Sequence, residues 1–366
     1  MSTKRVLFTG ARAPIVAYMA YVLDKAGCEV FAADSTYASV CTVSKFIRKF
    51  IKLPLVKEPA YKDVLCKAVR DYKIDYLIPT CEEIFYIAGF KEELSEYTNV
   101  FCDSAEKLIS LHDKWAFYNY LSKAALKAPH TVLAEQADKN FEVAHIIKPR
   151  FSRFASKVKC TNILPDTMAD KRHIVQDFVK GKQICSYALV QDGKIAAQCV
   201  YEPVLTAGKG AGILLKKIRH PQAEEISARI SKDFSFSGQI AFDFIETAAK
   251  ELYVIECNPR ATNGLAFLGA DFAQIIAGEN KIKIYVPSAL ISRLAVWCYA
   301  ILQPLKTIKA RALSSRAADF ISFKKDTLAW LAQLPVVFCW LLKGIRYGGP
   351  TAASTADIEF NGEDFL

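Results

Sequence analysis

The N-terminal part of the chain alternates between short apolar runs and longer amphipathic stretches. The apolar runs Val6–Thr9, Glu29–Ala33 and Ile74–Pro79 are typical of short strands. Apolar residues recur at helical spacing in the stretches Ile15–Ala26, Tyr61–Tyr72 and Glu82–Glu96. Alternating strands and helices predict a parallel sheet with helices on both faces, so we expect an α/β Rossmann-like domain over residues 1–104.

The pattern changes after Ser104. Two helical stretches, Ala105–Leu111 and Lys114–Lys123, come before Pro129. Strand-like runs follow at Glu142–Lys148, His173–Val179, Ile184–Gln191 and Lys194–Tyr201, then a helix at Ala223–Phe234 and a hairpin of Gln239–Glu246 and Leu252–Asn258. Helices followed by runs of strands predict a second unit of the α+β type, with an antiparallel sheet.

Residues 281–366 are predicted to form an apolar, basic and mainly helical extension that ends in a polar tail. Its most apolar stretches are Ala289–Leu305, which Arg293 interrupts, and Leu328–Leu342, which Gln333 interrupts. A membrane span needs roughly 18–20 uninterrupted apolar residues. We therefore predict buried helices here, while contact with a membrane surface through these helices stays open.

The composition places the chain among globular proteins. Of 366 residues, 52% are hydrophobic and 23% are charged, which excludes a disordered or fibrous protein. The net charge of +10 favours anionic partners such as nucleotides and phosphates. Basic residues are spread along the chain rather than concentrated beside aromatic residues, so nucleic acid is not an expected partner.

Two further features bear on the compartment. The N-terminus leads directly into the first strand, without the apolar region of a signal peptide. The eleven cysteines are an odd number and contain no Cys-x-x-Cys pair, which argues against a disulfide framework or a zinc site. We expect a cytoplasmic protein.

A glycine turn after the first strand is placed as in dinucleotide-binding domains. Gly10 follows that strand, and Asp34 ends the next strand 24 residues later. The remaining glycines of the pattern are missing, because the positions from Ala11 to Pro14 contain none. We predict a Rossmann-like domain without NAD, and an NAD-dependent oxidoreductase is the less favoured alternative.

The predicted hairpin gathers acidic and amide side chains on one face. Side chains alternate along a strand, so Val254, Glu256 and Asn258 share a face, and Asp243 points away from the apolar side of its own strand. That apolar side consists of Ile240, Phe242 and Phe244. A turn centred on Ala249-Lys250 places Asp243 opposite Glu256. Two facing carboxylates and an amide oxygen suit Mg²⁺, and a solvated acidic face in another register is the alternative.

The same residues resemble a known motif. The run Glu-Cys-Asn-Pro-Arg over residues 256–260, thirteen residues after Asp243, resembles the metal-binding signature of the ATP-grasp ligases. In that family the carboxylates and the asparagine hold Mg²⁺ ions that bridge the phosphates of ATP. The resemblance therefore implies that Asp243, Glu256 and Asn258 are metal ligands, and that Arg260 neutralises the transferred phosphoryl group or the acyl phosphate.

Three other segments resemble parts of this family in the right order. His112-Asp113-Lys114 resembles the start of the small lid subdomain, and Ile146-Ile147-Lys148-Pro149 resembles the strand with the second ATP-binding lysine. Gln176-Asp177-Phe178-Val179 resembles the hinge that receives adenine, and Gln183 stands where the family usually has a ribose-binding glutamate. The resemblance implies ATP contacts for Lys114, Lys148, Gln176, Phe178, Val179 and Gln183, and a catalytic role for Lys148 and Arg260.

One departure concerns the phosphate loop of the family, which is usually rich in glycine. The corresponding segment, Arg150–Lys157, contains no glycine. Serine and cationic side chains are left to cover the triphosphate, so the cradling by backbone amides that the family uses is in doubt.

The resemblance covers roughly residues 105–280, with a lid at about 115–180, and it implies an ATP-dependent, ADP-forming carboxylate–amine ligase. Such an enzyme activates a carboxylate as an acyl phosphate and joins it to an amine, so the expected partners are two small molecules. Tight positioning and charge stabilisation do most of the work in this chemistry, which fits the lack of a protein nucleophile. A non-catalytic ATP-binding module that works with a carrier protein or a membrane is the alternative. The sequence leaves the acid, the amine and the oligomeric state open.

Substrate-binding candidates rest on position alone. Glu82 and Glu83 follow a predicted strand of the parallel sheet, where open α/β sheets bind ligands, although capping of a helix explains them equally well. Arg219 lies near the glycine-rich segment 208–212, which either closes over a substrate or simply connects two strands.

The polar tail alternates acidic and apolar residues. Asp357 and Glu359 alternate with Ile358 and Phe360. If the tail folds back over the first domain, its carboxylates become candidates for binding an amino group of the substrate. A disordered tail is the alternative.

Overall fold

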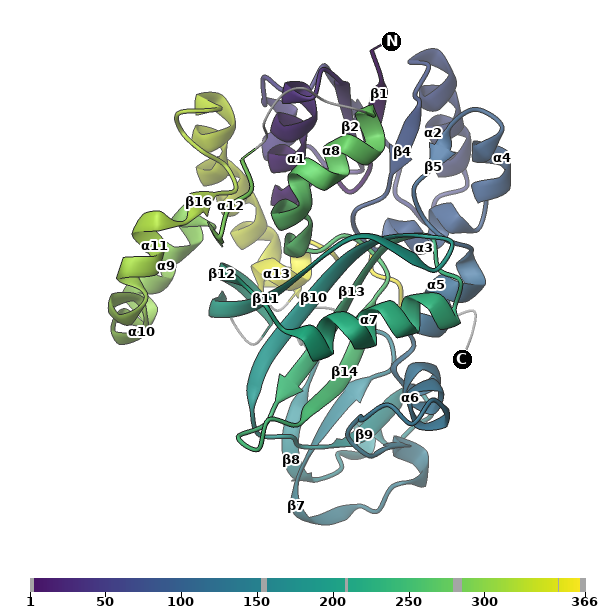
Figure 1. The fold of residues 1–366 in the computed structure, drawn as a ribbon, viewed down its shortest axis with the longest axis vertical. Coiled ribbons are helices and arrows are strands. Elements are labelled where there is room, and N and C mark those ends of the chain that lie inside the picture. Colours follow the sequence, from purple (N-terminus) through teal and green to yellow (C-terminus); the bar gives the residue numbers. More distant parts are fainter. Residues whose placement is uncertain (1–2, 153–156, 208–209, 279–284, 348, 363–366) are drawn as a thin grey trace.

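A computed structural model describes residues 3–152, 157–207, 210–278, 285–347 and 349–362. The chain forms three β-sheets and a helical C-terminal extension (Figure 1). In the view of Figure 1 the first domain lies at the top, the largest sheet in the middle and a small sheet at the bottom, with α9 to α11 projecting at the left.

The first domain contains a parallel sheet in the order β3-β2-β1-β4-β5. Its strands are β1 (Arg5–Phe8), β2 (Glu29–Asp34), β3 (Lys49–Lys52), β4 (Tyr76–Ile78) and β5 (Asn99–Val100). Its helices are α1 (Pro14–Lys25), α2 (Ala60–Asp71), α3 (Glu83–Ala88) and α4 (Lys91–Ser95). In the central strand β1, Val6 and Phe8 pack with α1, whereas Leu7 packs with α2 on the other face. Helices on both faces of a parallel sheet confirm the Rossmann-like prediction.

Two details of this domain differ from the prediction. The edge strand β3 was missed because its sequence, Lys-Phe-Ile-Lys, has too little apolar character to stand out. The single helix expected over Glu82–Glu96 is two short helices, α3 and α4, because the chain leaves the helix at Gly89. Glycine is a weak helix former, so a break at this position is physically reasonable.

The largest sheet has the order β14-β13-β10-β11-β12-β15-β16 and is antiparallel except for the last pair. Its strands are β10 (Lys182–Gln191), β11 (Lys194–Ala207), β12 (Ala211–Ile218), β13 (Gly238–Glu246), β14 (Leu252–Asn258), β15 (Ala289–Ile291) and β16 (Ala318–Asp319). Helices α5 (Ala105–His112), α6 (Lys114–Lys123) and α7 (Pro221–Asp233) pack on one face, and α8 (Gly269–Ala277) lies between this sheet and α1.

The small sheet has the order β6-β9-β7-β8 and is antiparallel. Its strands are β6 (Thr131–Leu133), β7 (Asn140–Pro149), β8 (Lys159–Ile163) and β9 (His173–Asp177). They fall within the range 115–180 in which a lid is predicted. A small apolar core that includes Ile147 and Val175 holds this sheet together.

The C-terminal extension contains α9 (Arg293–Leu302), α10 (Pro304–Lys309), α11 (Arg311–Arg316), α12 (Thr327–Tyr347) and α13 (Pro350–Ala353). By length and composition, α12 is the helix among the described residues that qualifies as a membrane span. The prediction of a buried helix over Leu328–Leu342 is wrong, because most large apolar side chains of α12 are exposed. The other apolar stretch, Ala289–Leu305, forms β15, α9 and the start of α10.

The tail packs against the first domain. Ile358 joins the core on the α2 side of the parallel sheet, and Phe360 stacks on Phe85 with ring centroids 4.8 Å apart. The backbone N–H of Phe360 donates a hydrogen bond of 2.9 Å to Glu82 Oε2. The segment that ends the described chain is therefore part of the folded structure.

Candidate active site

One cavity of about 570 Å³ lies where the parallel sheet, the small sheet and the largest sheet meet. Arg12 and Thr80 line it from the first domain, Lys148 from the small sheet, and Asp243 and Glu256 from the largest sheet. A volume of this size is typical of a site for a small-molecule ligand.

The metal-binding candidates lie together on one wall of this cavity. Asp243 on β13 pairs directly with Glu256 on β14, as the turn geometry predicted. Cys185 on β10 pairs with Asp243 from the other side, so three neighbouring strands present these side chains in a row. The expected approach of the two carboxylates is confirmed.

One detail of the predicted hairpin, the side to which Val254 points, is wrong. Val254 was expected on the face of Glu256 and Asn258, but it is fully buried among the phenylalanines of β13. The register shifts between Asp243 and Phe244, because Ile255 is an extra residue on β14. Such a bulge lets Ile255 and Glu256 both face the cavity, which simple alternation does not allow.

Asn258 and Arg260 complete this wall. The amide nitrogen of Asn258 lies 3.3 Å from Asp243 Oδ2 and 3.5 Å from Glu256 Oε1. Arg260 Nη2 donates a hydrogen bond of 2.9 Å to the amide oxygen of Asn258, and its side chain is buried. The arginine therefore fixes the orientation of the asparagine beside the carboxylates.

Two buried lysines face the carboxylates. Lys114 begins α6, where Asp113 caps the helix, and its Nζ lies 3.7 Å from Glu256 Oε2. Lys148 lies on β7 and is 4% exposed. The small sheet and the largest sheet thus bring opposite charges together across the cavity.

The charges shift the ionisation of these groups. Burial raises the pKa of Asp243 to about 7, and the negative charge of Glu256 adds to this effect. Burial acts in the same direction on Glu256, but Lys114 and Lys148 hold the pKa of its carboxyl below the ordinary value. Burial lowers the pKa of Lys148 to about 8, although Glu256 opposes the shift. Burying an unpaired charge costs free energy, so this cluster of carboxylates and lysines favours a charged ligand that completes its pairing.

The residues expected to contact adenine and ribose line the same cavity. Gln176 lies on β9 and is buried, with its amide donating a hydrogen bond of 2.9 Å to Thr131 Oγ1. Phe178 and Val179 follow this strand, and Gln183 lies on β10. The structure therefore brings the predicted nucleotide residues and the predicted metal ligands to one cavity.

Residues 111–264 match the family profile of the ATP-grasp domain. This part of the chain is an ATP-grasp domain. None of the curated proteins that were compared with the chain matches it in sequence.

Solved structures with the same fold include three ligases or carboxylases. N5-carboxyaminoimidazole synthetase from Staphylococcus aureus with ADP has a TM-score of 0.59 and 14% identity, covering 77% of this chain and 79% of that chain. L-amino acid ligase from Bacillus licheniformis has a TM-score of 0.56 and 13% identity, covering 76% of this chain and 74% of that chain. A third structure is the biotin carboxylase domain of Hydrogenobacter thermophilus 2-oxoglutarate carboxylase with MgADP and bicarbonate. It has a TM-score of 0.58 and 10% identity, covering 78% of this chain and 72% of that chain. At these identities the comparisons establish the fold.

The substrate candidates do not reach the ATP-grasp cavity. Glu83 accepts hydrogen bonds of 2.9 Å from Thr9 Oγ1 and 3.0 Å from the backbone N–H of Thr80, so its carboxylate caps turns inside the first domain. Glu82 is fully buried, accepts a hydrogen bond from the backbone N–H of Phe360, and lies 3.9 Å from Arg260 Nε, behind the cavity wall. Arg219 is exposed after β12 and is not part of the cavity wall. A role of these three residues in substrate binding therefore stays a prediction, which their contacts within the protein do not support.

The glycine-rich segment reaches the cavity only in part. Gly210 and Gly212 line it, whereas residues 208–209 lie outside the described residues. In the loop Arg150–Lys157, Ser152 lines the cavity, and residues 153–156 lie outside the described part of the chain.

The turn at Gly10 is occupied by protein atoms. A Cβ at Gly10 would lie 2.7 Å from Glu83 Oε1, so the carboxylate fills the place where a pyrophosphate would approach. Asp34 accepts a hydrogen bond of 2.8 Å from the backbone N–H of Arg12 and pairs with its guanidinium. The acidic residue that binds ribose in dinucleotide sites is thus already engaged, which disfavours the oxidoreductase alternative.

Sequence analysis missed Arg12 as a cavity residue. Its guanidinium lies between Asp34 and Asp357, and it donates a hydrogen bond of 3.0 Å to the backbone oxygen of Ser354. The position of Arg12 directly after the first parallel strand was the available signal. Asp357 is paired with this arginine, so it is not free to hold a substrate amine as its position in the tail had suggested.

Proposed function

We propose that the protein is an ATP-dependent, ADP-forming ligase that activates a carboxylate as an acyl phosphate and joins it to an amine. The observation that carries the proposal is the arrangement of Asp243 and Glu256 opposite each other, with Lys114, Lys148 and Arg260 around the same cavity. Neutralising a triphosphate requires cations and a metal site side by side. The ADP and MgADP in similar structures support the same nucleotide and metal.

The carboxylate oxygen atoms of Asp243 and Glu256 fit Mg²⁺. Asn258 would add its amide oxygen once its amide group turns over, because its nitrogen faces the two carboxylates in this structure and its oxygen accepts a hydrogen bond from Arg260. The part of the chain that the structure describes has no group of three or more His, Cys, Asp or Glu residues that is suited to holding a metal. Mg²⁺ does not need such a group, because one or two carboxylates together with substrate phosphates and water complete its shell. When bound, Mg²⁺ would supply charge neutralisation for the phosphates of ATP.

The side chains have distinct roles in this proposal. Lys148 and Lys114 bind the phosphates of ATP, and Gln176 and Gln183 orient the base and the ribose. A carboxylate oxygen of the substrate attacks the γ-phosphorus, the bond to the β–γ bridging oxygen breaks, and ADP leaves. Arg260 stabilises the charge of the resulting acyl phosphate. The amine then attacks the carbonyl carbon, loses a proton, and phosphate leaves with the electrons of the broken C–O bond.

The variant Lys148→Ala is expected to weaken ATP binding. Removing a buried ammonium from the phosphates costs a charge-assisted contact, so the Kd for ATP should rise by about 10- to 100-fold. Calorimetric titration of MgATP into the purified protein measures this change. Lys139→Ala is the matched control, because Lys139 is an exposed lysine near the same sheet and pairs with exposed Asp166. Equal affinity in the Lys148 and Lys139 variants would contradict the assignment.

A screen of carboxylate and amine pairs tests the reaction class. With MgATP, we expect ADP to form when an acid and an amine are both present, with equal amounts of phosphate. Tight MgATP binding without ADP release for any pair would favour the non-catalytic module. Failure to bind MgATP would overturn the proposal itself.

A further inference from the structure

Helix α12 turns its apolar side to solvent. Ala329, Gln333, Trp340 and Gly344 are buried and face inward. On the outward side, large apolar residues three or four positions apart are 49–84% exposed: Leu328, Leu331, Leu334, Phe338, Leu341 and Ile345. They form a stripe about 25 Å long, at about 1.5 Å per residue. Surface helices of soluble proteins have the reverse arrangement, and apolar surfaces of this extent mark interaction sites.

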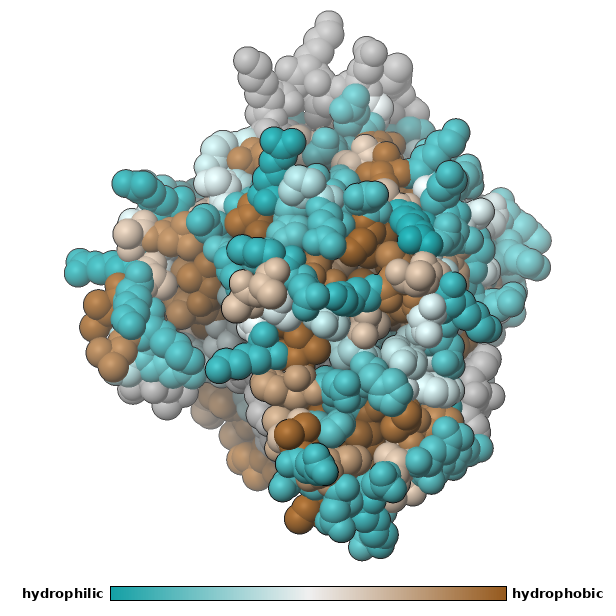
Figure 2. All heavy atoms as spheres, turned by 60° about the horizontal axis from the view of Figure 1, so that its bottom comes forward, coloured by the Kyte–Doolittle hydropathy of each residue, from teal (hydrophilic) through white to brown (hydrophobic). Residues whose placement is uncertain are grey.

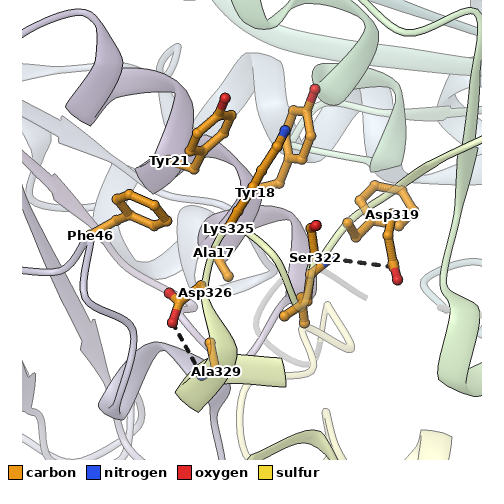
Figure 3. A pocket seen from close by; sticks show the side chains of 11 residues that line it. Ala17, Tyr18, Tyr21, Phe46, Asp319, Ser322, Lys325, Asp326 and Ala329 are labelled. Atoms are coloured by element: carbon orange, nitrogen blue, oxygen red, sulfur yellow. Dashed lines mark hydrogen bonds between the residues drawn. The ribbon is translucent and has the colours of Figure 1, made fainter. Parts of the chain in front are cut away.

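The helix is firmly attached to the first domain. Figure 3 shows the segment before α12 beside α1, where Lys325 Nζ lies 4.0 Å from the ring centroid of Tyr21. Asp326 accepts a hydrogen bond of 3.2 Å from the backbone N–H of Ala329 (Figure 3). Its other carboxylate oxygen accepts a hydrogen bond from the hydroxyl of Ser44 in the first domain. Further along the helix, the Arg12 guanidinium lies 5.8 Å from the Trp340 ring. These contacts orient α12 with its apolar stripe outward.

A second group of exposed apolar side chains lies on α9 and α10, and α9 contacts α12 through Trp297 and Trp330. Phe323 lies against Trp330 with ring centroids 5.3 Å apart, and Trp297 of α9 lies 6.3 Å from the same ring. Leu305 and Ile308 of α10 are 75% and 67% exposed. On the face shown in Figure 2, hydrophobic side chains reach the surface beside hydrophilic ones on the lobe at the left.

The exposed charged side chains of the C-terminal extension itself have one sign. Within the described residues of the range 285–347, every exposed charged side chain is basic. These cations include Lys306, Lys309, Arg311, Lys324, Lys343 and Arg346. The two acidic residues of the range are engaged internally, Asp319 with Arg293 and Asp326 with Ser44. No charged residue occurs between Thr327 and Leu342, so the cations flank the apolar stripe.

We propose that the outward side of α12, together with α10, docks on the surface of an anionic lipid bilayer. An apolar helix face bordered by lysine and arginine, with aromatic rings nearby, is the composition of helices that lie in the plane of a membrane interface. The apolar side chains would enter the headgroup region, and the flanking cations would contact anionic headgroups. This inference does not depend on the ligase chemistry.

The charge pattern favours a bilayer over other occupants. A second copy of the chain would bring two cationic faces together, which is unfavourable. Nucleic acid would use the cations but leave the apolar stripe uncovered. A full membrane span would require α12 to abandon its contacts with the first domain at Ser44 and Arg12.

Co-sedimentation of the full chain with vesicles tests this surface. We expect the protein to pellet with mixed phosphatidylcholine–phosphatidylglycerol vesicles, to remain in solution with pure phosphatidylcholine, and to be released by high salt. The variant Leu331→Glu/Phe338→Glu should reduce the pelleted fraction at least about tenfold, because a charge in the stripe cannot enter the apolar layer. Lys343→Glu/Arg346→Glu should weaken binding to anionic vesicles specifically.

The matched control is Val143→Glu/Ile163→Glu. These two side chains are 67% and 57% exposed on the small sheet, away from the stripe, and their substitution should leave vesicle binding unchanged. Thermal melts by circular dichroism establish that every variant is folded. No binding by the wild-type protein, or equal binding by the stripe variant, would overturn the proposal. A dimer that the stripe variant abolishes would also overturn it, because a second copy would then cover the stripe. Vesicle attachment that resists both salt and alkaline carbonate would overturn it as well, because such attachment indicates a membrane span.

Discussion

Replacing Glu256 with glutamine is expected to lower ADP release by at least about 100-fold while leaving the fold intact. The substitution keeps the shape of the side chain and removes one of the two facing negative charges. Lys114 and Lys148 then keep their positive charges without this partner, and the metal site loses a ligand charge. The change is measured as steady-state ADP formation with a productive acid–amine pair and saturating MgATP.

The stability of this variant separates a functional loss from a structural one. Loss of the partner of Lys114 destabilises the fold, while the end of the repulsion between Asp243 and Glu256 offsets part of that loss. The unfolding free energy should therefore fall by less than the roughly 3–5 kcal/mol that breaking a buried ion pair costs. Glu251→Gln is the control, because Glu251 precedes the same strand and pairs with exposed Lys127. Normal turnover in Glu256→Gln would show that the proposed metal site is wrong.

Replacing Phe360 with alanine is expected to lower the unfolding free energy by about 3–5 kcal/mol. Phe360 is 7% exposed and lies against Phe85, Tyr86 and Phe151, with ring centroids 4.8, 5.7 and 5.5 Å away. The substitution removes these contacts and leaves a cavity between the tail and the first domain. Urea unfolding followed by circular dichroism measures the loss.

The control for this prediction is Val143→Ala, at a side chain that is 67% exposed, which should change stability by no more than about 0.5 kcal/mol. If Phe360→Ala were as stable as the control, the docking of the tail would be energetically unimportant. The tail would then be only a surface segment, as the alternative interpretation of its sequence holds.

Local sequence patterns predicted the features of the site that depend on one hairpin. The turn near Lys250, which adopts a positive φ of 63°, sets the pairing of Asp243 with Glu256, and alternation places both on the cavity side. The helix that begins at Lys114 was also predicted at its observed bounds, because Asp113 is a clear capping residue. These features are determined by residues close together in the chain.

Features that depend on distant contacts were not predictable. The bulge at Ile255 shifts Val254 into the core, and nothing in the local sequence marks an extra residue in that strand. The roles of Glu82 and Glu83 are decided by Phe360 and Thr9, which lie far away in the chain. Hydrophobicity alone also suggested that α12 is buried, because composition does not report which side of a helix has a neighbour.

The fate of a labelled oxygen tests the proposed chemistry most directly. The acid of a productive pair is labelled with ¹⁸O in its carboxylate, and the products of one turnover with MgATP and the amine are analysed by mass spectrometry. Attack of the carboxylate on the γ-phosphorus predicts that one labelled oxygen leaves with inorganic phosphate and that the nucleotide product is unlabelled ADP. Labelled AMP, or ATP turnover that leaves all of the label in the carboxylate-derived product, would contradict the account.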